Sequence, residues 1–201
     1  MFKGGGFKEA REELGTFPED SADAFELLLE WIYTGSFHSI DRDADEPLLT
    51  TMVHARIQLY GLAEKICLSN LADYTMTRLV AIAQDPSPLN PPTAEIVRIA
   101  YDITAHGSPL RKFVSMWLYF SMRDEQQCRA STAHHVSIVL AGGGVEVVGD
   151  VIAHLRNDDH DQLLTFHEKI DGVLVNPDYP LMCDFHTHAK DEECSNRQRA
   201  Y

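Results

Sequence analysis

The clearest signal in the chain is Ala24-Phe-Glu-Leu-Leu-Leu-Glu-Trp-Ile-Tyr-Thr-Gly35. Its apolar residues recur at the i, i+3, i+4, i+7 spacing of one helix face, at Phe25, Leu28, Leu29 and Ile32. Asp20 or Ser21 can cap the first turn, and Gly35 can end the last turn in a left-handed conformation. We therefore predict a helix over 21–34 whose apolar stripe is packed against other elements.

Outward from this helix, the helical spacing of apolar residues recurs along the chain. Residues typical of the start of a helix are found at Pro47, Ser69, Thr93 and Ser108-Pro109. Further helices are expected over 47–65, 70–84, 93–105, from 108 onward, and near 129–141, 145–155 and 160–170. Two segments, 14–17 and 36–40, are short enough and apolar enough to be strands. The predicted fold class is mainly α with a small α+β remnant of one or two short strands.

The composition of the chain opposes two classes of function, nucleic-acid binding and membrane association. The chain has 201 residues and a formal charge of −14, from 17 Lys+Arg against 31 Asp+Glu, which opposes binding to phosphate backbones and anionic membranes. The longest strongly apolar run, Phe113 to Met122, is about half of the roughly 20 residues that span a bilayer. The start of the chain lacks the apolar stretch of a signal peptide, and its four cysteines are expected to be reduced thiols. We expect an intracellular protein, cytoplasmic or nuclear, that binds neither nucleic acid nor membrane.

A proline-rich stretch divides the predicted helices into two groups. Residues 85–92 contain four prolines in eight residues, and proline both removes a backbone donor and disfavours helix in the residue before it. We therefore expect four parts: a helical domain over 1–84, a linker over 85–92, a helical extension over 93–172 and a polar Cys/His tail over 173–201.

No catalytic motif stands out. His134 and His135 are adjacent and so point to different faces of a helix, and the Gly142–Gly149 stretch lacks the Lys-Ser/Thr of a phosphate-binding loop. The Asp158-Asp-His-Asp161 cluster leaves a metal hydrolase as a minor alternative, although its spacing does not match a calcium loop. We expect the chain not to be an enzyme and to need no cofactor for its main function.

The tail holds one constellation of metal-binding residue types. Two thiols and two imidazoles, the donors that zinc prefers, fall within twelve residues at Cys183, His186, His188 and Cys194. One interpretation is that zinc gathers a tail that has no packing role of its own. The other is a polar tail whose thiols have no function. The zinc interpretation also leaves open a zinc-dependent, DNA-associated transcriptional regulator, although the charge of −14 opposes it and Arg197 and Arg199 alone make no basic groove.

Several landmarks, in order, resemble the BTB/POZ domain family: Gly5-Gly-Phe-Lys-Glu-Ala10, Phe17-Pro-Glu-Asp20, Ala24 to Gly35, and Leu59-Tyr-Gly-Leu-Ala-Glu-Lys-Ile66 with Leu71. Gly107-Ser-Pro-Leu-Arg111 and the Cys/His tail are similar to the fungal branch of that family. The resemblance implies a helical cluster flanked by a short sheet over 1–84, followed by the helical extension. Family members place two strands and a helix before the Gly-Phe-Lys-Glu segment, so a BTB domain truncated at its N-terminus is expected.

The resemblance also implies a function. BTB domains are non-catalytic protein–protein interaction modules that form dimers with themselves or with another BTB protein, and they often link a substrate to a cullin-type ubiquitin ligase. By this resemblance the chain is an adaptor or a dimerising scaffold. The residues expected to contact a protein partner are Phe25, Leu28, Leu29, Ile32, Tyr33, Leu59 and Tyr60.

Overall fold

The computed structural model describes residues 20–40, 45–84, 92–123, 144–157 and 185–188, together with Ser137, Ala141, Glu192 and Cys194. Several predicted features lie wholly or mostly outside these residues: the strand at 14–17, the linker 85–92, the helices 129–141 and 160–170, His134-His135, Asp158–Asp161, Cys183, Arg197 and Arg199. The described part is mainly helical, as predicted, and contains no strand.

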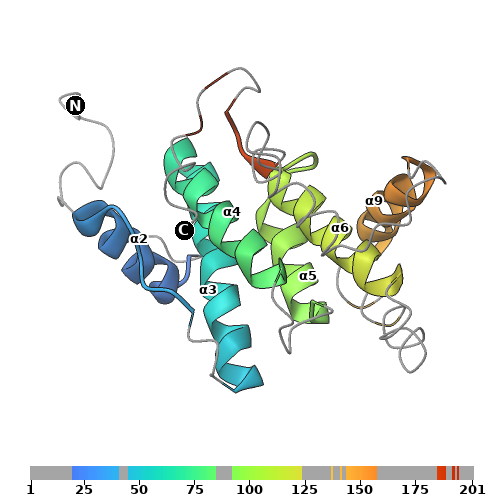
Figure 1. The fold of residues 1–201 in the computed structure, drawn as a ribbon, viewed down its shortest axis with the longest axis horizontal. Coiled ribbons are helices and arrows are strands. Elements are labelled where there is room, and N and C mark those ends of the chain that lie inside the picture. Colours follow the sequence, from blue (N-terminus) through green and yellow to red (C-terminus); the bar gives the residue numbers. More distant parts are fainter. Residues whose placement is uncertain are drawn as a thin grey trace, which may run out of the picture.

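Six helices form the described fold, and five of them match a predicted helix within about two residues at each end. They are α2 (Ala22–Thr34), α3 (Glu46–Lys65), α4 (Ser69–Gln84), α5 (Ala94–Ile103), α6 (Pro109–Arg123) and α9 (Gly144–Asn157). For α6 only the start was predicted, at Ser108-Pro109, and the helix begins there. Figure 1 shows them side by side, with α2 at one end of the molecule and α9 at the other. In this arrangement α3 packs on α2, α4 and α5, while α6 packs on α4, α5 and α9.

Local capping explains where three of the six helices begin. Asp45 Oδ1 accepts a hydrogen bond from Leu48 N at 3.1 Å, and Thr93 Oγ1 accepts one from Ile96 N at 3.3 Å. Ser108 Oγ accepts from Leu110 N at 3.3 Å, ahead of Pro109 in the first turn of α6. These starts were predicted at Pro47, Thr93 and Ser108-Pro109 and are confirmed; Ser69, predicted as a cap, is instead the first residue of α4.

The bounds of α2 and its end at Gly35 are as predicted, but its buried side is not, and neither predicted cap forms: Ser21 precedes the helix without a side-chain hydrogen bond, and the Asp20 carboxylate binds Lys65 Nζ instead. Gly35 closes the helix at φ 74° and donates from its N–H to Trp31 O. The buried residues are Ala24, Leu27 and Leu28, whereas Leu29 and Ile32 are exposed. The prediction of one continuous packed stripe was therefore wrong, because α2 packs chiefly on one neighbour, α3, and a single neighbour covers only part of a helix.

No strand forms over 36–40, in contrast to the prediction. Phe37 is buried with its ring edge-on to Tyr74 at 4.9 Å. The backbone of His38 is bonded by side chains, since its N–H donates to Glu30 Oε1 at 2.8 Å and its carbonyl accepts from Arg56 Nη2 at 2.7 Å. These side chains satisfy the polar groups that a neighbouring strand would otherwise pair with.

One cluster of buried apolar side chains runs through all six helices. It includes Tyr60 and Leu62 of α3, Met76 of α4, Ile96 of α5 and Trp117 of α6. Residues from both sides of the proline-rich segment thus share one core. Where α3 meets the end of α5, Gly61 allows close approach of Ile103, because a Cβ atom on Gly61 would lie only 2.8 Å from Ile103 Cδ1.

Candidate functional site

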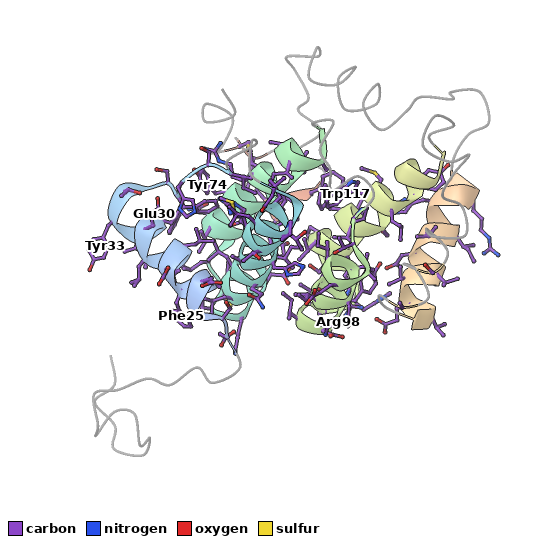
Figure 2. The ribbon with its side chains drawn as sticks, turned by 90° about the horizontal axis from the view of Figure 1, so that it is seen from below. Phe25, Glu30, Tyr33, Tyr74, Arg98 and Trp117 are labelled. Atoms are coloured by element: carbon purple, nitrogen blue, oxygen red, sulfur yellow. The ribbon has the colours of Figure 1, made fainter. Side chains whose placement is uncertain are left out.

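The outer side of α2 exposes three large apolar side chains. Leu29 is 51% exposed, Ile32 is 55% exposed and Tyr33 is 84% exposed. They occupy positions i, i+3 and i+4 and therefore lie side by side on one helix face. Figure 2 shows Tyr33 pointing away from the other helices at the end of the molecule. We call these three side chains the α2 face.

Carboxylates border the α2 face. Glu26 and Glu30 precede Leu29 and Tyr33 by three residues and lie next to them on the helix surface. Together with Asp23 they line a groove of about 430 Å³ between α2 and α3. His38 lies in this groove with its Nδ1 2.8 Å from Glu30 Oε2. The α2 face is thus an apolar surface with an acidic edge.

Three of the residues expected to contact a partner belong to the core instead. Leu59 and Tyr60 are completely buried in α3, and Leu28 is 7% exposed. Burial is also the main reason why the pKa of Tyr60 lies well above its usual range. Because α3 packs on three helices, the prediction that Leu59 and Tyr60 are available to a partner was wrong for this conformation. Phe25 is half-buried and packs against the core.

At the other candidate site, the structure brings together three of the four predicted metal ligands. His186 Nδ1 lies 3.3 Å from His188 Nε2 and 3.4 Å from Cys194 Sγ. The donor atoms of all three residues lie within 4.8 Å of one another. We call His186, His188 and Cys194 the tail cluster. The fourth predicted ligand, Cys183, is outside the described residues.

The segment 185–188 is packed onto α4 and α6. Phe185 is 2% exposed, and its ring meets Phe113 of α6 edge-on at 5.5 Å. Thr187 donates to Asp73 Oδ1 of α4 twice, from its N–H at 2.6 Å and from its hydroxyl at 2.9 Å. The expectation of a tail without a packing role was therefore wrong for these residues.

His186 is buried between this segment and α4. Its Nε2 lies 3.1 Å from Thr77 Oγ1, and the side chain is 7% exposed. The pKa of His186 is lowered to about 4, mainly by burial; Asp73 opposes this shift and His188 adds to it. The imidazole is therefore neutral at physiological pH, which is the form that donates a lone pair to a metal ion.

Sequence reasoning missed Asp73 and Thr77. Both lie on α4, more than a hundred residues before the tail in the sequence. As polar residues in an amphipathic helix they give no local sign of a distant partner. The available signal was Phe185, a large apolar side chain between Asp184 and His186.

Comparisons with known proteins gave no relative: no protein-family model matches the chain, and neither a curated protein nor a solved structure matches it. Among the residues that the structure describes, no helix combines the length and the apolar character that crossing a bilayer requires.

Proposed function

We propose that the chain is a non-catalytic protein–protein interaction module of the BTB/POZ type, and that its partner binds on the α2 face. The observation that carries this proposal is the exposure of Leu29, Ile32 and Tyr33 together on the terminal helix. Single exposed apolar residues are ordinary, whereas adjacent ones on a helix with an acidic border are typical of a contact surface. The resemblance of Ala24 to Gly35 to the BTB family supports the same conclusion.

The energetics of binding favour this face. Removing apolar surface from water contributes about 25 cal/mol for each Å², and a tyrosine ring is among the largest such surfaces. Tyrosine is also over-represented among the few residues that carry most of the binding energy at protein interfaces. Tyr33, the most exposed of the three, is therefore the expected anchor of the contact.

The charge of the chain favours one class of partner. Glu26 and Glu30 border the α2 face, Asp23 lies with them along the adjoining groove, and the whole chain carries −14. Two copies of such a surface would repel each other, as would a nucleic acid. We therefore propose a partner whose apolar contact side chains are surrounded by Lys and Arg. A cullin-type ubiquitin ligase scaffold is the partner class that the BTB resemblance implies, and the chain would then be its adaptor.

The polar groups beside the α2 face give no support to a catalytic alternative. His38 and Glu30 form a close pair, but both side chains are substantially exposed. The hydroxyl of Thr51 in the same groove donates to Pro47 O at 3.0 Å. No described side chain in the groove is therefore a nucleophile hydrogen-bonded to His38, which supports the non-catalytic part of the proposal.

The test is a direct binding titration with purified cullin-type scaffold protein. We expect Tyr33→Ser to weaken binding by at least about tenfold, because the few residues that dominate an interface, tyrosines among them, cost about 2 kcal/mol or more when truncated. Leu29→Ser should weaken binding by a smaller factor, because leucine is under-represented among such residues. Val145→Ser is the matched control, since Val145 is 89% exposed but lies on α9 at the opposite end of the molecule.

Three outcomes would overturn the proposal. The first is the absence of binding to any cullin-type scaffold. The second is an equal effect of Tyr33→Ser and Val145→Ser. The third is a homodimer, measured by light scattering, that Tyr33→Ser converts to a monomer, because the α2 face would then belong to a second copy of this chain.

A further inference from the structure

We propose that His186, His188 and Cys194 bind a zinc ion, which fastens the C-terminal segment to α4. This inference is independent of the proposed function, because the tail cluster shares no residue with the α2 face. The segment that carries its two histidines packs against α4 and α6. It rests on three observations: the spacing of the donor atoms, the hydrogen bond between His186 and Thr77, and the buried carboxyl group of Asp73.

Two of the three separations between donor atoms match a tetrahedral zinc site. With Zn–N bonds of about 2.05 Å and a Zn–S bond of about 2.3 Å, tetrahedral angles place two nitrogens about 3.3 Å apart, and a nitrogen and a sulfur about 3.6 Å apart. The observed separations are 3.3 Å between the two imidazole nitrogens and 3.4 Å between Cys194 Sγ and His186 Nδ1. The third pair, His188 and Cys194, has donor atoms within 4.8 Å of each other, so an ion would complete the site by drawing these two side chains together.

The contact of His186 with Thr77 determines which ring nitrogen of His186 can bind a metal ion. Thr77 Oγ1 donates its proton to the Asp73 carbonyl at 3.0 Å, so toward His186 Nε2 it can act only as an acceptor. His186 therefore carries its proton on Nε2, which leaves Nδ1 unprotonated and facing His188 and Cys194. Histidines that bind metals characteristically use their second nitrogen in this way, as a donor to a neighbouring group.

Asp73 supplies a charge that the ion would balance. Its side chain is 3% exposed, and among the described residues it has no Lys or Arg partner. Its Oδ1 accepts both hydrogen bonds from Thr187, the residue between the two histidines. A buried carboxylate is costly without a compensating positive charge. Zinc with one thiolate carries a net charge of +1, which would offset the carboxylate.

The donor set selects zinc over the hard cations. One sulfur and two imidazole nitrogens suit zinc, whereas magnesium, calcium and manganese prefer oxygen ligands. Cys194 binds as the thiolate and releases its proton to solvent, so zinc binding would release protons.

The experiment measures zinc in the purified full-length chain by elemental analysis, with cobalt(II) substitution as a spectroscopic readout. We expect one zinc ion for each chain and, with cobalt, a thiolate charge-transfer band together with the visible absorption of a tetrahedral site. Cys194→Ser and His188→Ala should lose the zinc, and Cys194→Ser should lose the charge-transfer contribution of its sulfur. Cys67→Ser is the matched control, because Cys67 is an exposed free cysteine that is not part of the tail cluster.

Two further measurements separate a metal site from a merely structural contact. Thr77→Val should keep the fold but weaken zinc binding by about tenfold or more, because loss of an outer-shell partner typically costs 10–100-fold in affinity. Chelation should lower the melting temperature of the wild type by about 5 °C or more, and should leave Cys194→Ser unchanged.

A wild-type chain that retains no zinc and shows no tetrahedral cobalt spectrum would overturn the inference. Equal zinc content in the wild type and Cys194→Ser would do the same. Tyr33→Ser, which disrupts the proposed partner surface, should leave zinc content unchanged, so failure of either proposal can be recognised without reference to the other.

Discussion

Arg111 shows how single polar side chains join elements of this fold. It is 8% exposed, and its guanidinium lies over the Tyr101 ring at 4.9 Å. Its Nη2 donates to the carbonyls of Tyr101 and Thr104 at the end of α5, and its Nη1 contacts Glu146 of α9 at 2.5 Å. The last carbonyls of a helix have no partner within the helix, so Arg111 takes the place of the missing donors.

We expect Arg111→Met to destabilise the fold by about 2–4 kcal/mol, because it leaves two buried carbonyls without a donor and removes a buried charge from its partners. Glu146→Gln is the matched variant on the other side of the ion pair. Glu146 is 62% exposed, so its loss should cost less than about 1 kcal/mol. Chemical denaturation of the two variants measures the difference. Equal effects would mean that the ion pair, rather than the carbonyls of α5, is what makes Arg111 important.

At the scale of the helices, α3 and α5 approach each other closely where Gly61 faces Ile103. Gly61 lies inside α3, and a Cβ atom there would meet Ile103 of α5 at 2.8 Å and 3.0 Å. Glycine normally costs a helix interior about 1 kcal/mol relative to alanine. Its presence at this position is explained by the approach of Ile103.

A larger side chain at Gly61 should separate these two helices. We expect Gly61→Leu to destabilise the fold by about 1–3 kcal/mol through overpacking. Ile103 is 41% exposed, so Ile103→Ala alone should have a smaller effect. In the double variant Gly61→Leu with Ile103→Ala, the space left by the isoleucine side chain should restore part of the stability lost in Gly61→Leu. Chemical denaturation of the wild type, the two single variants and the double variant gives the coupling energy between the two positions. Strictly additive effects would show that Gly61→Leu acts through the helix itself and not through α5.

Most of the helices could be predicted because their ends are determined locally. Thr93, Ser108-Pro109 and Gly35 act on backbone groups within four residues of themselves, so a single sequence contains the information. The buried side of α2 could not be predicted in this way, because it depends on how many helices surround α2. Likewise, the segment 36–40 forms no strand because Arg56, eighteen residues away from His38, bonds its backbone.

The contacts of the C-terminal segment with α4 could not be predicted either, because they join residues more than a hundred positions apart in the sequence. The chemistry of His186, His188 and Cys194 was visible in their residue types, and the structure brings their donor atoms together. The docking of Phe185 on Phe113, and the support from Asp73 and Thr77, depend on tertiary packing between α4, α6 and the end of the chain. No periodic pattern in a four-residue segment could have predicted these contacts.

At the scale of the whole molecule, the helices differ in how firmly they are held. α3 packs against three helices, whereas α2 packs chiefly on α3 and α9 chiefly on α6. α2 has 13 residues, a length at which an isolated helix is only marginally stable in water. Its attachment rests on the buried Ala24, Leu27 and Leu28 and the partly buried Phe25 and Trp31, together with the Lys65–Asp20 ion pair of 2.8 Å. The helix that carries the proposed partner surface is therefore one of the two least supported.

This difference predicts an order of amide hydrogen exchange. We expect the amides of α3 and α4 to exchange only with global unfolding, and those of α2 to exchange faster through local opening, because few buried contacts hold α2 in place. Exchange followed by mass spectrometry gives protection for each helix separately. A bound partner on the α2 face should slow exchange in α2 more than in α9, which is the internal control because it also has one main neighbour. If α2 in the free chain were as protected as α3, the two helices would unfold as one unit, and the α2 face would be a rigid surface before any partner binds.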